Sequence, residues 1–191
     1  MGISFWEVVD AAKTKPYGFQ PFYPGPGLGG HCIPLDPYYL SWKAREYGFH
    51  TSMIESSMMI NDKMPEYCVE RARKILNHHE KALKNARVLV LGVAYKQDID
   101  DPTHTRHLHN MPYNGVVVAE DEQALVDFYD PWISQYKEHG KVVTGLTAIS
   151  PEIVAGYDLV MITTAHSNVD YEMVQKHAKV IFDTKNVMKN I

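Results

Sequence analysis

A cysteine at the end of a glycine-rich segment is the first feature of this sequence whose residue types could do chemistry. Residues 22–36 read Phe-Tyr-Pro-Gly-Pro-Gly-Leu-Gly-Gly-His-Cys-Ile-Pro-Leu-Asp, which places Cys32 after four glycines and Asp36 four residues further on. Glycine has no Cβ, so backbone amides in such a segment can approach a ligand closely. A thiol with a carboxylate nearby is typical of covalent catalysis on a carbonyl group. The segment predicts a ligand-binding loop with Cys32 as candidate nucleophile.

Plainer interpretations of the same residues stay open at this point. A loop of glycine and proline is more often a connection, and a lone cysteine is more often a small buried hydrophobic residue. Cys68 lies inside a predicted helix, and we interpret it as a packing residue. The glycine run also imitates a dinucleotide fingerprint, but no predicted strand precedes it and a proline follows, so the required context is missing.

Helical patterns dominate the first half of the chain, around this loop. Apolar spacing predicts a helix over 5–13, followed by a long ordered loop over 14–34. Asp36 and Pro37 are predicted as the N-cap and first residue of the next helix, which should end near Tyr47. Two more helices are expected over 52–61 and 65–77, and the polar stretch 78–86 is a plausible domain boundary.

From Arg87 onward, short apolar runs alternate with helical pieces. Strands are predicted at 87–95, 126–131, 141–144, 159–164 and 179–183, and helices at 151–155 and 170–178. This alternation indicates an α/β fold with a parallel sheet. Ligands of such sheets bind beyond the carboxyl ends of the strands, here near residues 94–96, 130–131 and 163–166. We therefore expect a helical domain over 1–85 and a Rossmann-like domain over 86–191.

Composition excludes several classes of protein. The 191 residues are 45% hydrophobic and 22% charged with a net charge of −4, too apolar for a disordered chain and without the Lys/Arg runs of a nucleic-acid-binding protein. No apolar stretch approaches the ~20 residues of a membrane span, and the first residues do not form a signal peptide. Two cysteines cannot form a disulfide framework, so a cytoplasmic location is expected.

The cysteine loop resembles that of the nucleotide-sugar 6-dehydrogenases, the family of UDP-glucose and UDP-N-acetylglucosamine dehydrogenases. The resemblance covers most of the chain, and the form Pro-Gly-Pro-Gly-Leu-Gly-Gly-His-Cys looks most like the branch that acts on UDP-N-acetylhexosamines. The matching segments are 5–12, 29–37, 92–96 with Asp98, Asp100 and Asp101, 129–131, 163–166 and 182–186.

The resemblance implies a mechanism and a set of site residues. The family oxidises the sugar C6 alcohol to a carboxylate with two NAD molecules, through a cysteine thiohemiacetal and a thioester that water hydrolyses. Cys32 matches the cysteine and Asp36 the aspartate placed to help that water. The predicted substrate contacts are Tyr23, Gly29 and Gly30 in the glycine loop and Tyr95 and Lys96 in the second domain. A homodimer is expected from the family alone.

The sequence departs from the family pattern in three places. The Rossmann unit that holds NAD in the family is not found in these 191 residues, so we expect this chain alone not to turn over NAD. Between residues 101 and 126, Arg106 is out of register with the family arginine that is expected to reach the cofactor, and only 119–125 looks helical. Lys185 stands where the family commonly has arginine near the end of the last strand.

Three further interpretations stay open. His104, His107 and His109 invite a metal site, but histidines alone on a proline-rich segment are weak evidence, and we predict no metal. A truncated UDP-binding or dimerisation module without chemistry is the alternative to a dehydrogenase part. A thiol hydrolase built on Cys32 is the third hypothesis.

Overall fold

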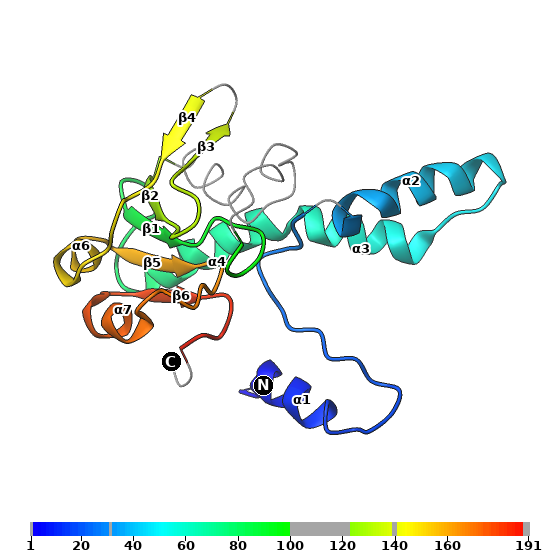
Figure 1. Ribbon diagram of the computed structural model, residues 1–191, viewed down its shortest axis with the longest axis horizontal. Helices are drawn as coiled ribbons and strands as arrows, with labels where there is room; N and C mark the ends of the chain where they lie inside the picture. Colours follow the sequence, from blue (N-terminus) through cyan, green and yellow to red (C-terminus); the bar gives the residue numbers. More distant parts are fainter. Residues whose placement is uncertain (1, 31, 100–122, 139–140, 189–191) are drawn as a thin grey trace.

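The computed structural model describes residues 2–30, 32–99, 123–138 and 141–188 of the chain. Its first half is helical and its second half is built around a parallel β-sheet (Figure 1). The predicted α/β class, with a helical segment followed by a Rossmann-like domain, is confirmed. The domain limits 1–85 and 86–191 stay a prediction.

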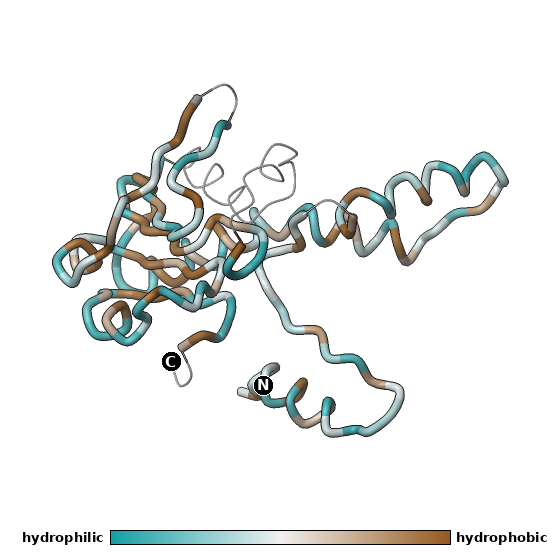
Figure 2. The backbone as a smooth tube through the Cα atoms, in the orientation of Figure 1, coloured by the Kyte–Doolittle hydropathy of each residue, from teal (hydrophilic) through white to brown (hydrophobic). Residues whose placement is uncertain are grey.

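Four helices make up the first half: α1 Phe5–Ala12, α2 Cys32–Glu46, α3 Ser52–Asp62 and α4 Met64–His78. Helices α2 and α3 lie side by side as a hairpin that projects away from the sheet, while α4 runs under the sheet (Figure 1). The hairpin contains hydrophobic residues that lie outside the core of the sheet domain (Figure 2). Only Lys63 separates α3 from α4, so the hairpin continues into the helix that supports the sheet.

The predicted start of α2 was wrong. Asp36 was expected as the N-cap with Pro37 at the first position, but the helix already begins at Cys32 and contains Pro37 in its second turn. Pro34 lies in the first turn, where a backbone N–H has no intrahelical partner to lose. Pro37 removes only the bond to the carbonyl of Ile33, at the edge of the helix, so the helix tolerates both prolines.

Four parallel strands form the main sheet in the order β2-β1-β5-β6. The strands are β1 Arg87–Leu91, β2 Leu125–Tyr129, β5 Leu159–Ile162 and β6 Ile181–Asp183. Strand β1 pairs with β2 on one side and with β5 on the other. Leu125, predicted as the last residue of a helix, begins β2 instead. Strand β2 is added on one side of β1, and the later strands β5 and β6 are added on the other side, so the strand order reverses between β1 and β5.

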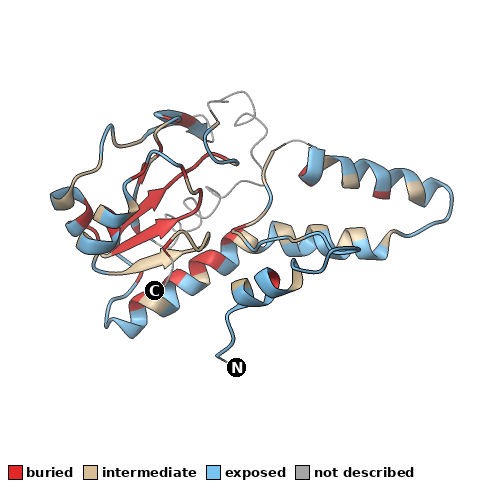
Figure 3. Ribbon diagram, turned by 60° about the horizontal axis from the view of Figure 1, so that its bottom comes forward, coloured by how far each residue is buried: buried red, intermediate tan, exposed pale blue. Residues whose placement is uncertain are grey.

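Both faces of the sheet are covered, which explains the nearly continuous apolar sequence of β1. Val88 and Val90 point to the face packed by α4, through Val69 and Leu76 among others. Leu89 and Leu91 point to the other face, covered by helices α6 Pro151–Ala155 and α7 Tyr171–His177. Figure 3 shows the buried residues concentrated in these central strands and on the sheet side of α4.

The strand predicted at 141–144 forms, but it is not part of the parallel sheet. It is β4 (Lys141–Thr144), which pairs antiparallel with β3 (Gln135–Glu138) in a separate two-stranded sheet. Val142 is exposed and Val143 packs against the core, an alternation typical of an antiparallel strand with one solvated face. A strand of this pattern could not lie inside a sheet covered on both faces.

Among the helices of the described ranges, none combines the length and the apolar character that crossing a bilayer requires.

Candidate functional site

The two candidate catalytic residues lie at the start of α2. Cys32 is the first helical residue and Asp36 lies one turn later, so the thiol and the carboxylate occupy the same face of the helix. Both side chains are exposed.

The glycine loop that leads to Cys32 passes over Tyr95, which follows β1. Gly30 has a φ of +96°, and a Cβ built on it would lie 3.2 and 3.3 Å from two carbons of the Tyr95 ring. A side chain at position 30 would therefore be strained and would press on the ring. The structure thus brings together two of the predicted substrate residues from opposite halves of the chain, and Lys96 lies exposed beside Tyr95.

The same loop also approaches Lys185, just beyond β6. A Cβ built on Gly25 would lie 2.7 Å from Lys185 Nζ. Burial lowers the pKa of Lys185, and the described part of the chain gives its ammonium group no ion pair. A half-buried ammonium group without a carboxylate partner is suited to an anionic ligand.

Asn61 fastens the loop to the end of α3. Its side-chain oxygen accepts a hydrogen bond of 2.7 Å from the backbone N–H of Leu28. The neighbouring Gly27 has a φ of +114° and lies against Asn61 and Met64. The loop therefore rests on α3 at its middle and on Tyr95 and Lys185 on either side.

Tyr23, a predicted substrate contact, has its described contacts with α1 instead. Its ring stacks on Trp6 with 5.2 Å between ring centroids, and its hydroxyl donates to the Asp10 carboxylate at 3.1 Å. Lys13 donates to the Tyr23 hydroxyl at 3.2 Å. Hydrogen bonds to Asp10 and to Tyr23 raise the pKa of Lys13. Nothing in these contacts joins Tyr23 to Tyr95.

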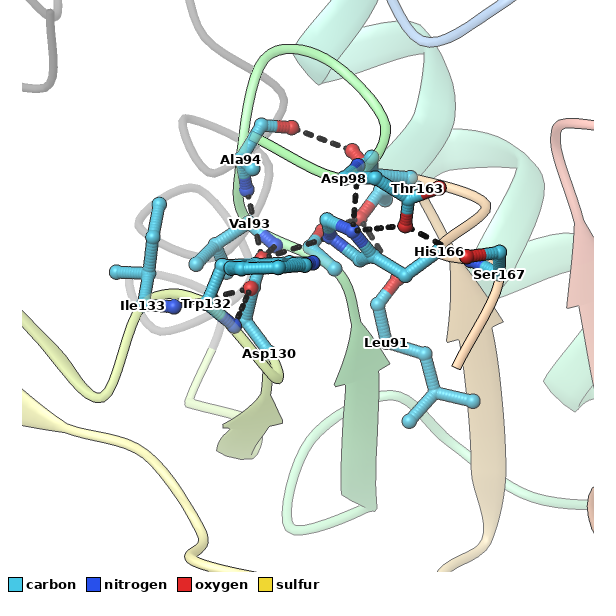
Figure 4. Close-up of polar contacts among 12 residues, drawn as sticks. Leu91, Val93, Ala94, Asp98, Asp130, Trp132, Ile133, Thr163, His166 and Ser167 are labelled. Atoms are coloured by element: carbon cyan, nitrogen blue, oxygen red, sulfur yellow. Dashed lines mark hydrogen bonds and ion pairs between the residues drawn. The ribbon is translucent and has the colours of Figure 1, made fainter. Parts of the chain in front are cut away.

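A buried polar cluster supports the segment that carries Tyr95. It consists of Asp130 after β2, His166 after β5 and the backbone of residues 93–98 after β1 (Figure 4). Burial alone would raise the pKa of Asp130, but hydrogen bonds from His166 and from the Ala94 and Trp132 amides outweigh it and lower that pKa. These residues lie at the carboxyl ends of three parallel strands, where the sequence predicts a ligand site.

Several predicted residues fall outside the described ranges: His31, Asp100, Asp101, Arg106 and the histidines at 104, 107 and 109. Within the residues that are described, no group of three or more His, Cys, Asp or Glu side chains is arranged to hold a metal ion.

Two family models match the two parts of the chain that contribute residues to the candidate site. The central domain of the UDP-glucose/GDP-mannose dehydrogenase family matches residues 1–63, and the UDP binding domain of the same family matches residues 89–190. The chain belongs to the UDP-glucose/GDP-mannose dehydrogenase family. The resemblance inferred from the cysteine loop is thereby confirmed.

Curated relatives in this dehydrogenase family include enzymes named for N-acetylated sugars. The chain is 33% identical to the UDP-N-acetyl-D-glucosamine 6-dehydrogenase of Pseudomonas aeruginosa, with 98% of this chain and 44% of the relative covered. It is 30% identical to the UDP-N-acetyl-D-mannosamine dehydrogenase of Methanocaldococcus jannaschii, covering 98% and 41%. The chain thus spans less than half the length of these relatives.

Solved structures of the family share this fold. The UDP-D-ManNAc dehydrogenase of Pyrococcus horikoshii superposes with a TM-score of 0.79 at 28% identity, over 100% of this chain and 42% of that one. Members of the family use NAD. The glycine run at 25–30 follows α1 and an irregular segment rather than a strand, so it does not fit a dinucleotide-binding turn.

Sequence reasoning did not select two residues that the structure places at the loop. Lys185 was noted only as a departure from the family arginine, although its position after a parallel strand was a usable signal. Asn61 gave no signal, because its bond to Leu28 joins residues 33 positions apart in two different elements.

Proposed function

We propose that this chain is the substrate-binding and nucleophile-bearing part of an NAD-dependent UDP-sugar 6-dehydrogenase. The proposal assigns the cysteine loop to a helical domain within residues 1–85 and the nucleotide end of the substrate to residues 86–191. The alternative is a UDP-binding or dimerisation module without chemistry.

The meeting of the glycine loop with the UDP-binding domain carries this proposal. Gly30 lies against Tyr95 and Gly25 lies against Lys185, so the loop that ends in Cys32 crosses the carboxyl edge of the sheet. A diphosphate bound at this edge would meet the Lys185 ammonium group, while the loop amides reach toward the sugar. Gly29 and Lys96 are assigned to the same substrate, and Tyr23 stays a predicted contact.

Cys32 and Asp36 are assigned the chemistry of the second half of the reaction. The Cys32 thiolate adds to the carbonyl carbon of a C6 aldehyde and forms a C–S bond, and the oxygen takes a proton. After oxidation to the thioester, a water activated by Asp36 attacks the same carbon, the C–S bond breaks, and the carboxylate and the thiol are released.

NAD accepts the hydrides in the family's reaction when it is bound, and the glycine run at 25–30 does not fit it because no strand precedes that run among the described residues. We therefore assign no step of hydride transfer to residues of this chain, and we expect no NAD turnover from it alone. The cytoplasmic location inferred from two cysteines stays a prediction.

The substrate class proposed is a UDP-N-acetylhexosamine. The names of the Pseudomonas and Methanocaldococcus relatives support an N-acetylated sugar. UDP-glucose, which has no N-acetyl group, is the alternative substrate to test.

Calorimetry with UDP and with UDP-N-acetylglucosamine tests the proposed site. We expect wild-type chain to bind both, and Lys185→Met to weaken UDP binding about tenfold, because one charge-assisted contact to phosphate is lost. Lys176→Met, which removes an exposed lysine of α7, is the matched control and should bind like wild type. Absence of UDP binding by folded wild type would overturn the proposal. Binding of UDP with a Cys32 thiol no more reactive than free cysteine would favour the non-catalytic module.

A homodimer is the second part of the proposal. The α2–α3 hairpin exposes many large apolar side chains, and a second copy of the chain would cover part of them. These exposed side chains include Tyr39, Leu40, Trp42, Met53, Met59 and Ile60. A groove of about 950 Å³ between the two helices is lined by Trp42 and Met59. Apolar surface of this kind on an elongated element is typical of an interface.

A further inference from the structure

We propose that Asp130 and His166 are positioning residues that fix the segment 93–98 and thereby place Tyr95 and Lys96 against the substrate. The inference rests on the proposed function, because it takes the ligand at Tyr95 and Lys96 to be the UDP end of the substrate. It adds two residues that touch neither the substrate nor the thiol.

Asp130 holds the first end of the segment. One carboxylate oxygen, Oδ2, accepts hydrogen bonds from the backbone N–H groups of Val93 at 2.8 Å and Ala94 at 2.9 Å. The other oxygen accepts from the amides of Trp132 at 2.8 Å and Ile133 at 3.0 Å. The carboxylate is therefore fixed by its own loop while it fixes the neighbouring one (Figure 4).

His166 holds the other end of the segment. Its Nδ1 accepts a hydrogen bond of 3.1 Å from the backbone N–H of Asp98. Because Nδ1 accepts, the proton of the neutral ring lies on Nε2, which donates to Asp130 Oδ2 at 3.1 Å. The imidazole is fully buried, so solvent water cannot replace a hydrogen-bond partner that the ring loses.

The turn after strand β5 adds further bonds beside this pair. The hydroxyl of Thr163 donates to the carbonyl oxygen of Gly92, and that of Thr164 donates to the carbonyl oxygen of Ala94. The carboxylate of Asp98 accepts from the Ser167 amide at 2.9 Å. The bonds at both ends leave Tyr95, Lys96 and Gln97 as the apex of the segment.

The position of the pair in the sheet connects it to ligand binding. The sheet changes its direction of growth between β1 and β5, and ligands of open parallel sheets bind at such a switch point. The pair spans this point and fixes the segment whose apex faces the glycine loop through Tyr95 and Gly30. A core made only of apolar residues would fill the same space without fixing backbone amides.

Two substitutions of His166 separate positioning from general stability. In His166→Asn the amide group lies near the place of Nδ1 and can accept from the Asp98 amide. In His166→Gln the amide group reaches the place of Nε2 and can donate to Asp130, but the Asp98 amide loses its partner. Both variants replace an aromatic ring by an amide, so their losses of packing are similar, and thermal unfolding measures any difference.

Hydrogen exchange of individual backbone amides and calorimetry with UDP are measured on the full chain for both variants. We expect the Asp98 amide to exchange at least about tenfold faster in His166→Gln than in His166→Asn, with Val93 and Ala94 protected in both. We expect UDP binding about tenfold weaker in His166→Gln, and within about threefold of wild type in His166→Asn.

Equal exchange of the Asp98 amide in the two variants, or equal UDP affinity despite different exchange, would overturn the inference. If either variant unfolds, Asp98 exchange in Asp130→Asn against wild type gives the same test, since loss of the Nε2 partner should release His166. Failure of wild type to bind UDP would overturn the proposed function and the ligand named here. The exchange data test separately whether the two residues hold the segment 93–98 in place.

Discussion

Asp130 carries a buried carboxylate whose hydrogen-bond partners are four backbone amides and one imidazole. Such a group is costly to bury and is stable only because its donors are all in place. Burial by itself would raise the pKa of Asp130, and these bonds reverse the sign and hold it below the ordinary value of 3.8. The carboxylate therefore favours the folded chain whenever it is ionised.

Stability against acid should depend on this residue. With a pKa lower in the folded chain than in the unfolded one, the contribution of Asp130 is complete above about pH 5 and is lost as the pH falls through the folded pKa. We expect Asp130→Asn to lower the free energy of unfolding by about 3 kcal/mol at pH 7, and the difference from wild type to shrink below about pH 4. Urea unfolding between pH 2.5 and 7 measures it. The exposed Glu172→Gln is the control, and a difference that does not change with pH would contradict the prediction.

The turn after β1 has room only for glycine at position 92. Gly92 has a φ of +85°, and a Cβ there would lie 2.5 Å from the carbonyl oxygen of Thr164 in the turn after β5. The backbones of two neighbouring turns thus come together at a position that only glycine fills. This close approach allows the hydroxyl groups of Thr163 and Thr164 to reach the carbonyl oxygens of Gly92 and Ala94.

A comparison of two glycines separates backbone strain from crowding. Gly48 also has a positive φ, of +71°, but a Cβ there would meet no described atom within 4 Å, whereas one on Gly92 would meet backbone atoms. We expect Gly48→Ala to cost about 1–2 kcal/mol of unfolding free energy, the cost of the left-handed conformation alone. Gly92→Ala should cost about 1–3 kcal/mol more, because the Thr164 turn must shift. Urea denaturation of both variants checks this, and equal losses would refute the crowding.

The elements themselves were largely predictable, and the exceptions have physical causes. The ranges predicted for α3, α4, β1 and β5 agree with the structure to within a few residues, and the continuous apolar run of β1 reflects burial on both faces. Pro37 misled the prediction of α2, because proline is favoured at the first helical position but is also tolerated one turn later. Pairing of Lys141–Thr144 with Gln135–Glu138 depends on a partner strand whose polar sequence gave no signal.

The molecule as a whole is extended, with the α2–α3 hairpin projecting from the sheet (Figure 1). Side chains such as Trp42 and Tyr39, each 64% exposed, lie on this hairpin far from the buried clusters of the sheet. The α4 helix connects the hairpin to the sheet, so the proposed dimer would place two sheets at the ends of a shared helical centre.

Sedimentation velocity tests the proposed dimer. We expect wild type to sediment as a dimer and Trp42→Glu to shift it at least about tenfold toward monomer, since a charge would be buried in the interface. Tyr17→Glu alters a side chain that is 86% exposed outside the hairpin and should leave the dimer intact. A monomeric wild type, or an equal effect of both substitutions, would contradict the proposal.

The candidate site could be predicted only in part. Local motifs made it possible to predict four residues of the site from the sequence: Cys32, Asp36, Gly30 and Tyr95. The structure shows Gly30 close to Tyr95. The hydrogen bonds that support these residues could not be predicted, because they join residues such as Ala94 and Asp130 that follow different strands. Sequence patterns describe neighbours along a chain, while these contacts depend on the order of strands in the sheet.

The central place of β1 in the sheet also sets an order of events during synthesis. The segment that follows β1 needs Asp130 from the end of β2 and His166 from the end of β5, so it cannot take its final shape when it is first made. About 70 residues separate Val93 from His166, which corresponds to about 4–15 s at a synthesis rate of ~5–20 residues per second. Throughout that interval the segment 93–98 lacks partners that fix it, so the proposed ligand site can form only after His166 has been made.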